Sequence, residues 1–510
     1  MTAKALAAPL LLALALSACS SAPQHPAPQL PDTWFSAAGA HPADAESLAS
    51  WWRQFDDPQL TALVHRAMQQ NHDVRLAMAR VDSARAQLRQ SRAGLLPSFD
   101  LPGSASRQWI ENDQDAEPGS PLAEFIPDDD PIAFDSWELA LQATWELDLF
   151  GATRARRDSA AQQLRSAEAQ TVAARLAVAA NTAQGYLQLR ALQGQRALLV
   201  EGIEVARELE RIAGLLFHAG EVTRLDVEAT SAERASLEAD LDELDIHLAE
   251  AQLALDTLLA APPGSSAVQL AASTAVPLAE SRIAAGQPID LLRRRPDLIA
   301  EAARLDAAEL QALAARRDLF PKLAVQAAVG RSGFALGDAV SSASNFARVG
   351  ATFGLPLLDY ANRGAAIELA DAEGETAYIA FEQALARALE EVERGLTRIA
   401  GQQRRHAALS RTREHRERAH RLAQRSYELG EANLSEVLDA QRGALQARQR
   451  ALEGRTALAT AQVALYVALG GGWNAADGAA VSEISQRPEG SVGDNASRLA
   501  HGLLGSGRAE

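Results

Sequence analysis

The sequence predicts a mainly α-helical fold with a small β part, in which a helix-strand-strand-helix-helix order occurs twice. Two long runs, 132–261 and 357–487, contain no proline, and each is interrupted by a glycine, Gly220 or Gly430, that can end a helix in the left-handed conformation. Short segments near the start of these runs change to a period of two, which is typical of strands. Aromatic residues make up only 5% of the chain, as in long helices that pack along a seam.

The two halves of the chain align with each other, which indicates an internal duplication. The turn around Gly430 matches the turn around Gly220 at a separation of 210 residues. The segment 59–92 has a helical pattern and aligns with the second half at a separation of 224 residues without a gap. Seven aligned positions are identical: Asp73 and Asp297, Arg80 and Arg304, Asp82 and Asp306, Ala84 and Ala308, Arg92 and Arg316, Leu95 and Leu319, and Pro97 and Pro321. Because the separation falls from 224 to 210, the first half should carry about 14 additional residues, and we expect them in the acidic stretch after Trp109.

Four segments of about ten residues alternate between apolar and polar positions: 98–109, 136–147, 322–330 and 346–355. In the second of them the odd positions from Trp137 to Leu147 are apolar, and the even positions are polar except Ala140. This length and pattern match tilted transmembrane β-strands with one apolar and one wet face. A soluble four-stranded sheet packed on the helices is the alternative. The acidic interval 111–135 suits only water and favours transmembrane strands, and 332–345 is its shorter counterpart.

After Cys19 the chain has no stretch of about 20 apolar residues, so a crossing of the bilayer would need the strands. Four strands cannot close into a barrel, and unpaired strand edges are not tolerated in hydrocarbon. If the strands are transmembrane, other copies of the chain must complete the barrel. The pattern therefore predicts a homo-oligomer.

The predicted helices are unusually long. The segment 151–216 lacks proline, and about 60 helical residues would extend roughly 90 Å. In the helix that follows, leucines recur with the four-three spacing of a coiled coil, from Leu237 to Leu258. The same positions in the second half, from Ala447 to Ala468, carry small residues. The bulky seam of one half is thus a candidate partner for the small seam of the other.

The N-terminus resembles a bacterial lipoprotein signal. Lys4 supplies a positive charge, an apolar run continues to Leu16, and small residues precede Cys19, the single cysteine of the chain. We expect 1–18 to be the signal peptide and Cys19 the acylated first residue of a Pro-, Ala- and Ser-rich tether, 19–50. Several acyl chains anchor a protein stably to a membrane, and the lipoprotein sorting rule for a serine after the cysteine implies the outer membrane. The alternative is a buried thiol that ends an apolar segment.

The composition argues against several classes of function. A net charge of −17 argues against nucleic acid or an anionic membrane surface as the main partner. The chain has no nucleophile elbow, P-loop, dinucleotide-binding glycine motif or paired-cysteine motif, so we expect neither an enzyme nor a cofactor. His415 and His420 lie in an arginine-rich helical segment and lack metal-ligand spacing, so we expect no metal site. We expect 474–510 to be a disordered tail.

These features together resemble the outer membrane factor family of TolC-like efflux channels, in its lipoprotein branch of NodT type. The resemblance rests on the lipoprotein signal, the duplicated element order, the strands that follow Pro97 and Pro321, and above all Tyr427, Gly430 and the motif EVLDAQR at 436–442. It covers 51–473 and implies two repeats, 51–285 and 286–473. The family implies a trimer whose twelve strands form one outer-membrane β-barrel of a Gram-negative bacterium, continued by a helical tunnel into the periplasm. Such channels export drugs, toxic compounds or metal ions when a periplasmic adaptor protein and an inner-membrane pump dock on them.

The resemblance also implies roles for residues near the two tips. Glu436 and Asp439 match acidic rings that line the periplasmic constriction; their alternative role is as ordinary solvated charges at a helix start. Asp226 and Tyr427 match a hydrogen-bonded pair that helps to hold the tips shut. Ala432 stands where a latch arginine would be expected, and Arg224 is a candidate substitute.

The adaptor would contact the tips at Gly220, Glu221, Gly430 and Glu431. The competing class is a lipid-anchored periplasmic coiled-coil adaptor or structural protein without a pore. Adaptors carry one hairpin followed by β-rich domains, whereas this sequence has two hairpins that alternate with two strand pairs.

Overall fold

The computed structural model describes residues 30–36, 48–110, 132–266, 270, 274–279, 283–336, 340–356 and 359–473. The chain divides into two compact units. Unit 1 contains Asp82–Arg165 and Ala302–Ala380, and unit 2 contains Pro28–Val81, Ser166–Glu301 and Phe381–Glu510. Each unit thus takes segments from both halves of the duplicated chain.

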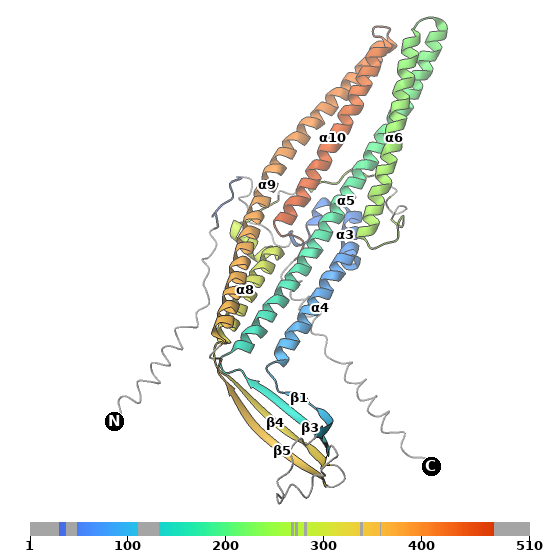
Figure 1. The fold of residues 1–510 in the computed structure, drawn as a ribbon. Coiled ribbons are helices and arrows are strands. Elements are labelled where there is room, and N and C mark those ends of the chain that lie inside the picture. Colours follow the sequence, from blue (N-terminus) through green and yellow to red (C-terminus); the bar gives the residue numbers. More distant parts are fainter. Residues whose placement is uncertain are drawn as a thin grey trace, which may run out of the picture. The chain divides into compact units, whose positions relative to one another are not determined.

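Unit 1 contains an antiparallel sheet (Figure 1). Its strands are β1 (Ser98–Asp100), β2 (Gly103–Ile110), β3 (Ile132–Leu147), β4 (Lys322–Leu336) and β5 (Val340–Gly354). Both β1 and β2 pair with β3, β3 pairs with β4, and β4 pairs with β5. The sheet is therefore a meander of four strand positions whose two outer edges are unpaired within the described chain.

The predicted strands are present, but their bounds differ. The first is split at Leu101 and Pro102, because proline has no N–H to donate to the ladder. The segments predicted as loops are shorter than expected: 132–135 belongs to β3, and most of 332–345 belongs to β4 and β5, which remain in register up to Leu336 opposite Val340. Small and polar side chains do not prevent pairing when the backbone continues in register.

The helices repeat with the separations that the sequence predicts. They are α3 (Pro58–Gln70), α4 (His72–Ala93), α5 (Ala152–Ala219), α6 (Arg224–Leu258), α7 (Leu291–Arg294), α8 (Pro296–Arg317), α9 (Tyr360–Glu428) and α10 (Leu434–Ala468), with short 3-10 turns η2 (Trp51–Phe55) and η3 (Pro288–Asp290). Both α4 and α8 have 22 residues, and both α6 and α10 have 35. Within the described chain, none of these helices combines the length and apolar character that a bilayer crossing requires.

The single helix expected over 59–92 is two helices, because Asn71 interrupts it. Asn71 is buried, its carbonyl oxygen accepts from the N–H of Asp73 at 2.7 Å, and its amide donates to the carbonyl of Leu258 at 2.9 Å. The aligned position in the second half is Arg295, which directly precedes α8 and is also buried. A buried polar side chain that needs partners outside its own helix explains a break at the same place in both repeats.

Unit 2 has its core where both repeats meet. Trp51 is fully buried and stacks on Tyr466 with a centroid distance of 5.7 Å. From this core two helical hairpins extend, α5 with α6 and α9 with α10 (Figure 1).

The bulky seam of α6 does not pack on the small seam of α10 as the sequence suggested. Leu237 and Leu244 of α6 pack with Leu199 and Ile203 of α5. On α10, a Cβ added to Gly454 would lie 2.7 Å from Leu409 of α9. Each seam therefore packs on the long helix of its own hairpin, because a short turn returns the chain onto the helix that it has just left.

Candidate channel gate and membrane face

The two hairpin tips have the same backbone geometry. Gly220 has φ of 77° and Gly430 has φ of 75°. In the first tip the N–H of Gly220 donates to the carbonyl of Phe217 at 3.0 Å, and the N–H of Glu221 donates to Leu216 at 2.9 Å. The second tip repeats both bonds. This is the Schellman arrangement, which needs a left-handed residue and confirms both glycines as turn residues.

The predicted adaptor contacts lie at these turns, where Gly220, Glu221, Gly430 and Glu431 are all exposed. The structure therefore presents two equivalent and accessible tips in unit 2.

Asp226 caps the first turn of α6. Its carboxylate accepts from the N–H of Thr223 at 2.8 Å and from the hydroxyl of Thr223 at 2.7 Å. These hydrogen bonds from Thr223 lower the pKa of Asp226 below its ordinary value. Arg224, the candidate substitute for the absent latch arginine, lies 3.3 Å from Glu228 on its own helix.

Tyr427 lies at the end of α9 against a small apolar cluster near the tips. The cluster contains Leu209 and Ala213 of α5 and Leu434 of α10, and Val227, the neighbour of Asp226, packs on it together with Tyr427. The structure thus brings the two predicted latch segments to one cluster. Within the single chain the Asp226 carboxylate bonds to Thr223.

Glu436 and Asp439 are exposed on the first turns of α10. Leu434 and Val437 point into the protein between them. Asn433 caps this helix by accepting from the N–H of Glu436 at 3.0 Å. Asp439 lies 3.7 Å from the guanidinium of Arg442, which is a weak contact for two largely exposed groups.

Ion pairs between the hairpins are the feature that sequence reasoning missed. Arg442 of α10 lies 2.8 Å from Glu233 of α6, and Arg448 of α10 lies 2.7 Å from Glu201 of α5 and 3.0 Å from Glu417 of α9. Arg442 belongs to the recognised motif, but its partner is 209 residues away. No local pattern reveals such a pair. The two separations of the repeat could have indicated that α6 and α10 lie at the same level.

The sheet of unit 1 has two chemically different faces. Large apolar side chains of β3, Trp137, Leu139, Leu141 and Trp145, are exposed. The opposite face carries ion pairs across strands, Glu138 with Arg348 at 2.8 Å and Glu146 with Lys322 at 3.4 Å. The alternation predicted from the sequence is confirmed, and no helix of the described chain covers the apolar face.

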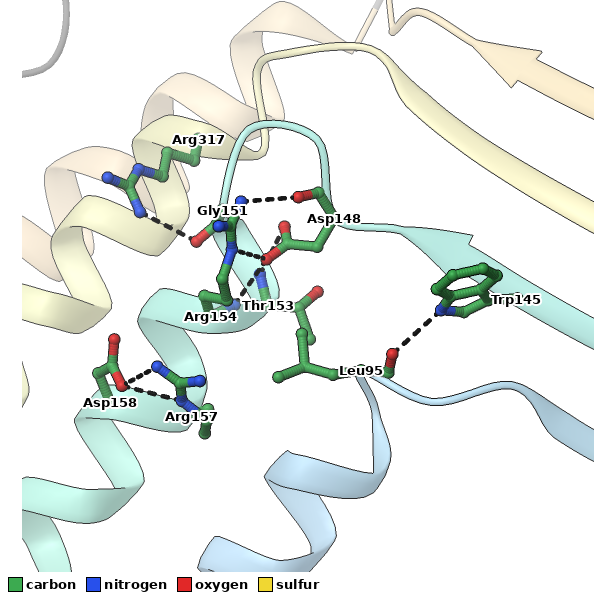
Figure 2. A network of polar contacts seen from close by, with 9 residues as sticks. All are labelled: Leu95, Trp145, Asp148, Gly151, Thr153, Arg154, Arg157, Asp158 and Arg317. Carbon is green, nitrogen blue, oxygen red and sulfur yellow. Dashed lines mark hydrogen bonds and ion pairs between the residues drawn. The ribbon is translucent and has the colours of Figure 1, made fainter.

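A polar junction fixes the chain where β3 leads into α5 (Figure 2). The indole N–H of Trp145 donates to the carbonyl of Leu95 at 3.0 Å, and Arg154 donates to the Asp148 carboxylate from its backbone N–H at 2.9 Å. Gly151 has φ of 82°, and its carbonyl accepts from Arg317 of α8 at 3.0 Å. Bonds to both repeats thus hold the transition from strand to helix.

Several predicted features lie outside the described residues: the signal peptide 1–18, the lipidation residue Cys19, the acidic interval 111–131 and the tail 474–510. Part of the expected tether, 30–36, is described and is docked on unit 2. Trp34 is buried there, and its indole donates to the carbonyl of Gly286 at 2.8 Å.

Comparisons with known proteins agree on one family. The family model described as outer membrane efflux protein matches residues 63–261 and 288–471. The pyoverdine export outer membrane protein OpmQ of Pseudomonas aeruginosa is 31% identical over 463 residues, which cover 90% of this chain and 95% of that protein. The outer membrane protein OprJ of the same organism is 30% identical and covers 91% and 95%. The solved structure of the outer-membrane channel OprN is 28% identical, covers 89% of this chain and 100% of that one, and superposes with a TM-score of 0.77.

Proposed function

Since this chain belongs to the outer membrane efflux protein family, we propose that three copies of it form a channel through which small molecules leave the cell. The chain is an outer-membrane efflux channel. The finer proposal covers the number of copies, the partners, the residues of the gate and the anchor.

The observation that carries the proposal is the sheet with two faces. An exposed apolar face with Trp137 and Leu141 suits lipid, and an ion-paired face with Glu138 and Arg348 suits a water-filled lumen. Each chain supplies four strand positions and leaves both edges unpaired. Three copies would supply twelve strands and could pair every edge in a closed barrel.

The tips are the proposed site of docking for a periplasmic adaptor protein, which connects the channel to an inner-membrane pump. Gly220 and Glu221 on one hairpin and Gly430 and Glu431 on the other are exposed and have the same geometry, so an adaptor could contact both in the same way. The name of the relative OpmQ points to pyoverdine as its cargo. For this chain we propose the broader class of drugs, toxic compounds or metal ions.

Glu436 and Asp439 are the proposed acidic rings. In a trimer each exposed carboxylate occurs three times about the axis, and six negative charges at a constriction would attract cations and repel anions. Asp226 and Tyr427 are the proposed latch. Their segments already meet at one cluster in the isolated chain.

Cys19 is the proposed acylation site, with 1–18 removed as a signal peptide and 19–50 as the tether. Cys19→Ser should abolish incorporation of radiolabelled palmitate. Continued labelling of this variant would contradict the assignment.

Bilayer recording tests the channel itself. The purified protein should give discrete conductance steps and migrate on gels as a heat-sensitive trimer. Glu436→Gln combined with Asp439→Asn should shift the reversal potential in a salt gradient towards lower cation preference and leave trimer formation intact. An unchanged reversal potential would rule out the acidic rings, and a protein without conductance would support the pore-free alternative.

A further inference from the structure

Helix α6 has an exposed apolar stripe that nothing in the chain covers. Every seventh residue belongs to it: Leu225, Ala232, Ala239, Ile246 and Leu253. All five are exposed, with Leu225 at 76% and Ile246 at 61%. A spacing of seven returns to the same side of a helix, and this side is opposite the seam of Leu237 and Leu244 that packs on α5.

Carboxylates flank this stripe. Glu228, Asp242, Glu243 and Glu250 are exposed on the same side of α6. We name these nine residues the acidic stripe. Its combination of apolar positions and flanking charges is the pattern of a coiled-coil contact with a partner of opposite charge.

Helix α9 carries the opposite charge at the same spacing. Arg404, Arg411, Arg418 and Arg425 are seven residues apart and exposed, and we name them the arginine column. Among the described residues none of the four makes an ion pair with a carboxylate; Arg418 lies 3.3 Å from His415. Leu422 beside the column is 70% exposed. Four cations without carboxylate partners in a chain with a net charge of −17 indicate a partner outside the chain.

The two surfaces lie on the outer helices of unit 2. Contacts link α6 to α5, α5 to α10 through Gly194 with Leu452, and α10 to α9 through Gly454 with Leu409. Figure 1 shows the same order, with α6 and α9 at opposite margins of the two hairpins. The acidic stripe and the arginine column thus cannot satisfy each other within one chain.

The charges match in height above the tips. Glu233 and Arg442, the tenth and ninth residues from the tip ends of α6 and α10, are ion-paired, so counting from the tips measures a common level. On this scale Arg425 and Glu228 are fourth and fifth, Arg411 and Asp242 are 18th and 19th, and Arg404 and Glu250 are 25th and 27th. Offsets of one or two residues are at most about 3 Å along a helix. Arg418 has no carboxylate at its level on the stripe.

We propose that the acidic stripe of α6 in one copy packs against the arginine column of α9 in the next copy. This inference rests on the proposed trimer. Rotation about an axis along the hairpins leaves each residue at its own height, so the matched levels within one chain are preserved between copies. Two different complementary surfaces make a head-to-tail contact, which closes as a ring.

Cysteine pairs test the contact in the full-length protein. Ile246 and Ala407 are the 23rd and 22nd residues from their tips and both are exposed. Ile246→Cys with Ala407→Cys should give covalently linked trimers after oxidation with copper phenanthroline on a non-reducing gel. The matched control, Ala232→Cys with Ala407→Cys, places the α6 cysteine 13 residues nearer the tip, about 20 Å away, and should give none. Each single-cysteine variant controls for Cys19.

Charge reversal provides a second test. Arg411→Glu alone and Asp242→Arg alone should lower the temperature at which the trimer dissociates, and the two together should restore it towards that of the unchanged protein. Trimers that form no cross-link and show no rescue would overturn this contact while the proposed trimer stands. A monomeric, non-conducting protein would overturn both proposals. A cross-linked product that contains a different protein would instead assign these faces to a docking partner.

Discussion

Ala260 and Gly470 occupy the same position of the two repeats and the same left-handed region of backbone conformation, with φ of 49° and 72°. The N–H of Ala260 donates to the carbonyl of Thr257 at 3.1 Å, and the N–H of Gly470 donates to Val467 at 2.9 Å. Alanine is unfavourable in this region because its Cβ crowds the backbone, whereas glycine adopts it freely. The first repeat therefore carries local strain that the second repeat does not.

Ala260→Gly should raise the thermal midpoint of the solubilised protein. Relief of the left-handed strain, less the larger entropy of glycine in the unfolded chain, leaves roughly 0.5–1 kcal/mol of stabilisation. Gly470→Ala is the reverse control and should destabilise more, because its Cβ would lie 2.6 Å from the carbonyl oxygen of Arg294. A lower midpoint for Ala260→Gly would show that this residue is not strained.

Leu141→Arg should destabilise the protein in a bilayer by about 2–4 kcal/mol if that side chain meets lipid near mid-membrane. Gln142→Arg is the matched control on the opposite face of β3 and should be tolerated. Urea unfolding after reconstitution into lipid vesicles measures both. Equal tolerance of the two substitutions would favour the soluble-sheet alternative.

Tyr427→Phe should raise the open population of the channel several-fold if its hydroxyl closes the latch, because one hydrogen bond contributes about 0.5–1.5 kcal/mol net. The variant keeps the ring that packs on Leu209 and Leu434, so the apolar cluster is preserved. Single-channel open probability is the measurement. A value equal to that of the unchanged channel would remove this hydroxyl from the gate.

Arg442→Met should weaken the connection between the two hairpins. The ion pair with Glu233 is partly exposed, so screening limits its worth to about 0.2–1 kcal/mol. Glu233→Gln should have a similar effect, and the double variant should be little worse than either one. Additive effects on open probability would mean that the two residues act separately.

Asp256→Asn should destabilise unit 2 at neutral pH, and the difference from the unchanged protein should shrink in acid. The Asp256 carboxylate is buried and accepts from the N–H groups of Gly264 at 2.7 Å and Ser266 at 3.1 Å. Burial by itself would raise its pKa, but hydrogen bonds from Ser266, Gly264 and Ser265 outweigh burial and hold the pKa below its ordinary value of 3.8.

The sign follows from this lowered pKa. Ionised Asp256 contributes its full stabilisation above about pH 5, and the contribution is lost as pH falls through 3.8 towards the folded-state value. Thermal midpoints of both proteins between pH 7 and pH 3 measure the difference. A gap that stays constant over this range would show that protonation of Asp256 does not affect stability.

The sequence by itself determined the duplication, both tips, the long helices and the alternation of the strands. Each of these depends on neighbours within a few residues: a left-handed glycine ends a helix at Gly220 and Gly430, and a period of two marks β3 whatever lies around it. The family motif at 436–442 added the candidate gate for the same reason, because it is a contiguous stretch.

Tertiary structure decided which helix faces meet. The pairing of Arg442 with Glu233, the break at Asn71 and the packing of each seam within its own hairpin depend on residues about 200 positions apart, or on a backbone carbonyl that only the fold brings near. A heptad stripe or an exposed charge has the same sequence signature whether it faces its own hairpin, solvent or another copy. Side-chain chemistry defines what a face can bind, and only the three-dimensional arrangement determines that α6 and α9 leave their outer faces uncovered within the chain.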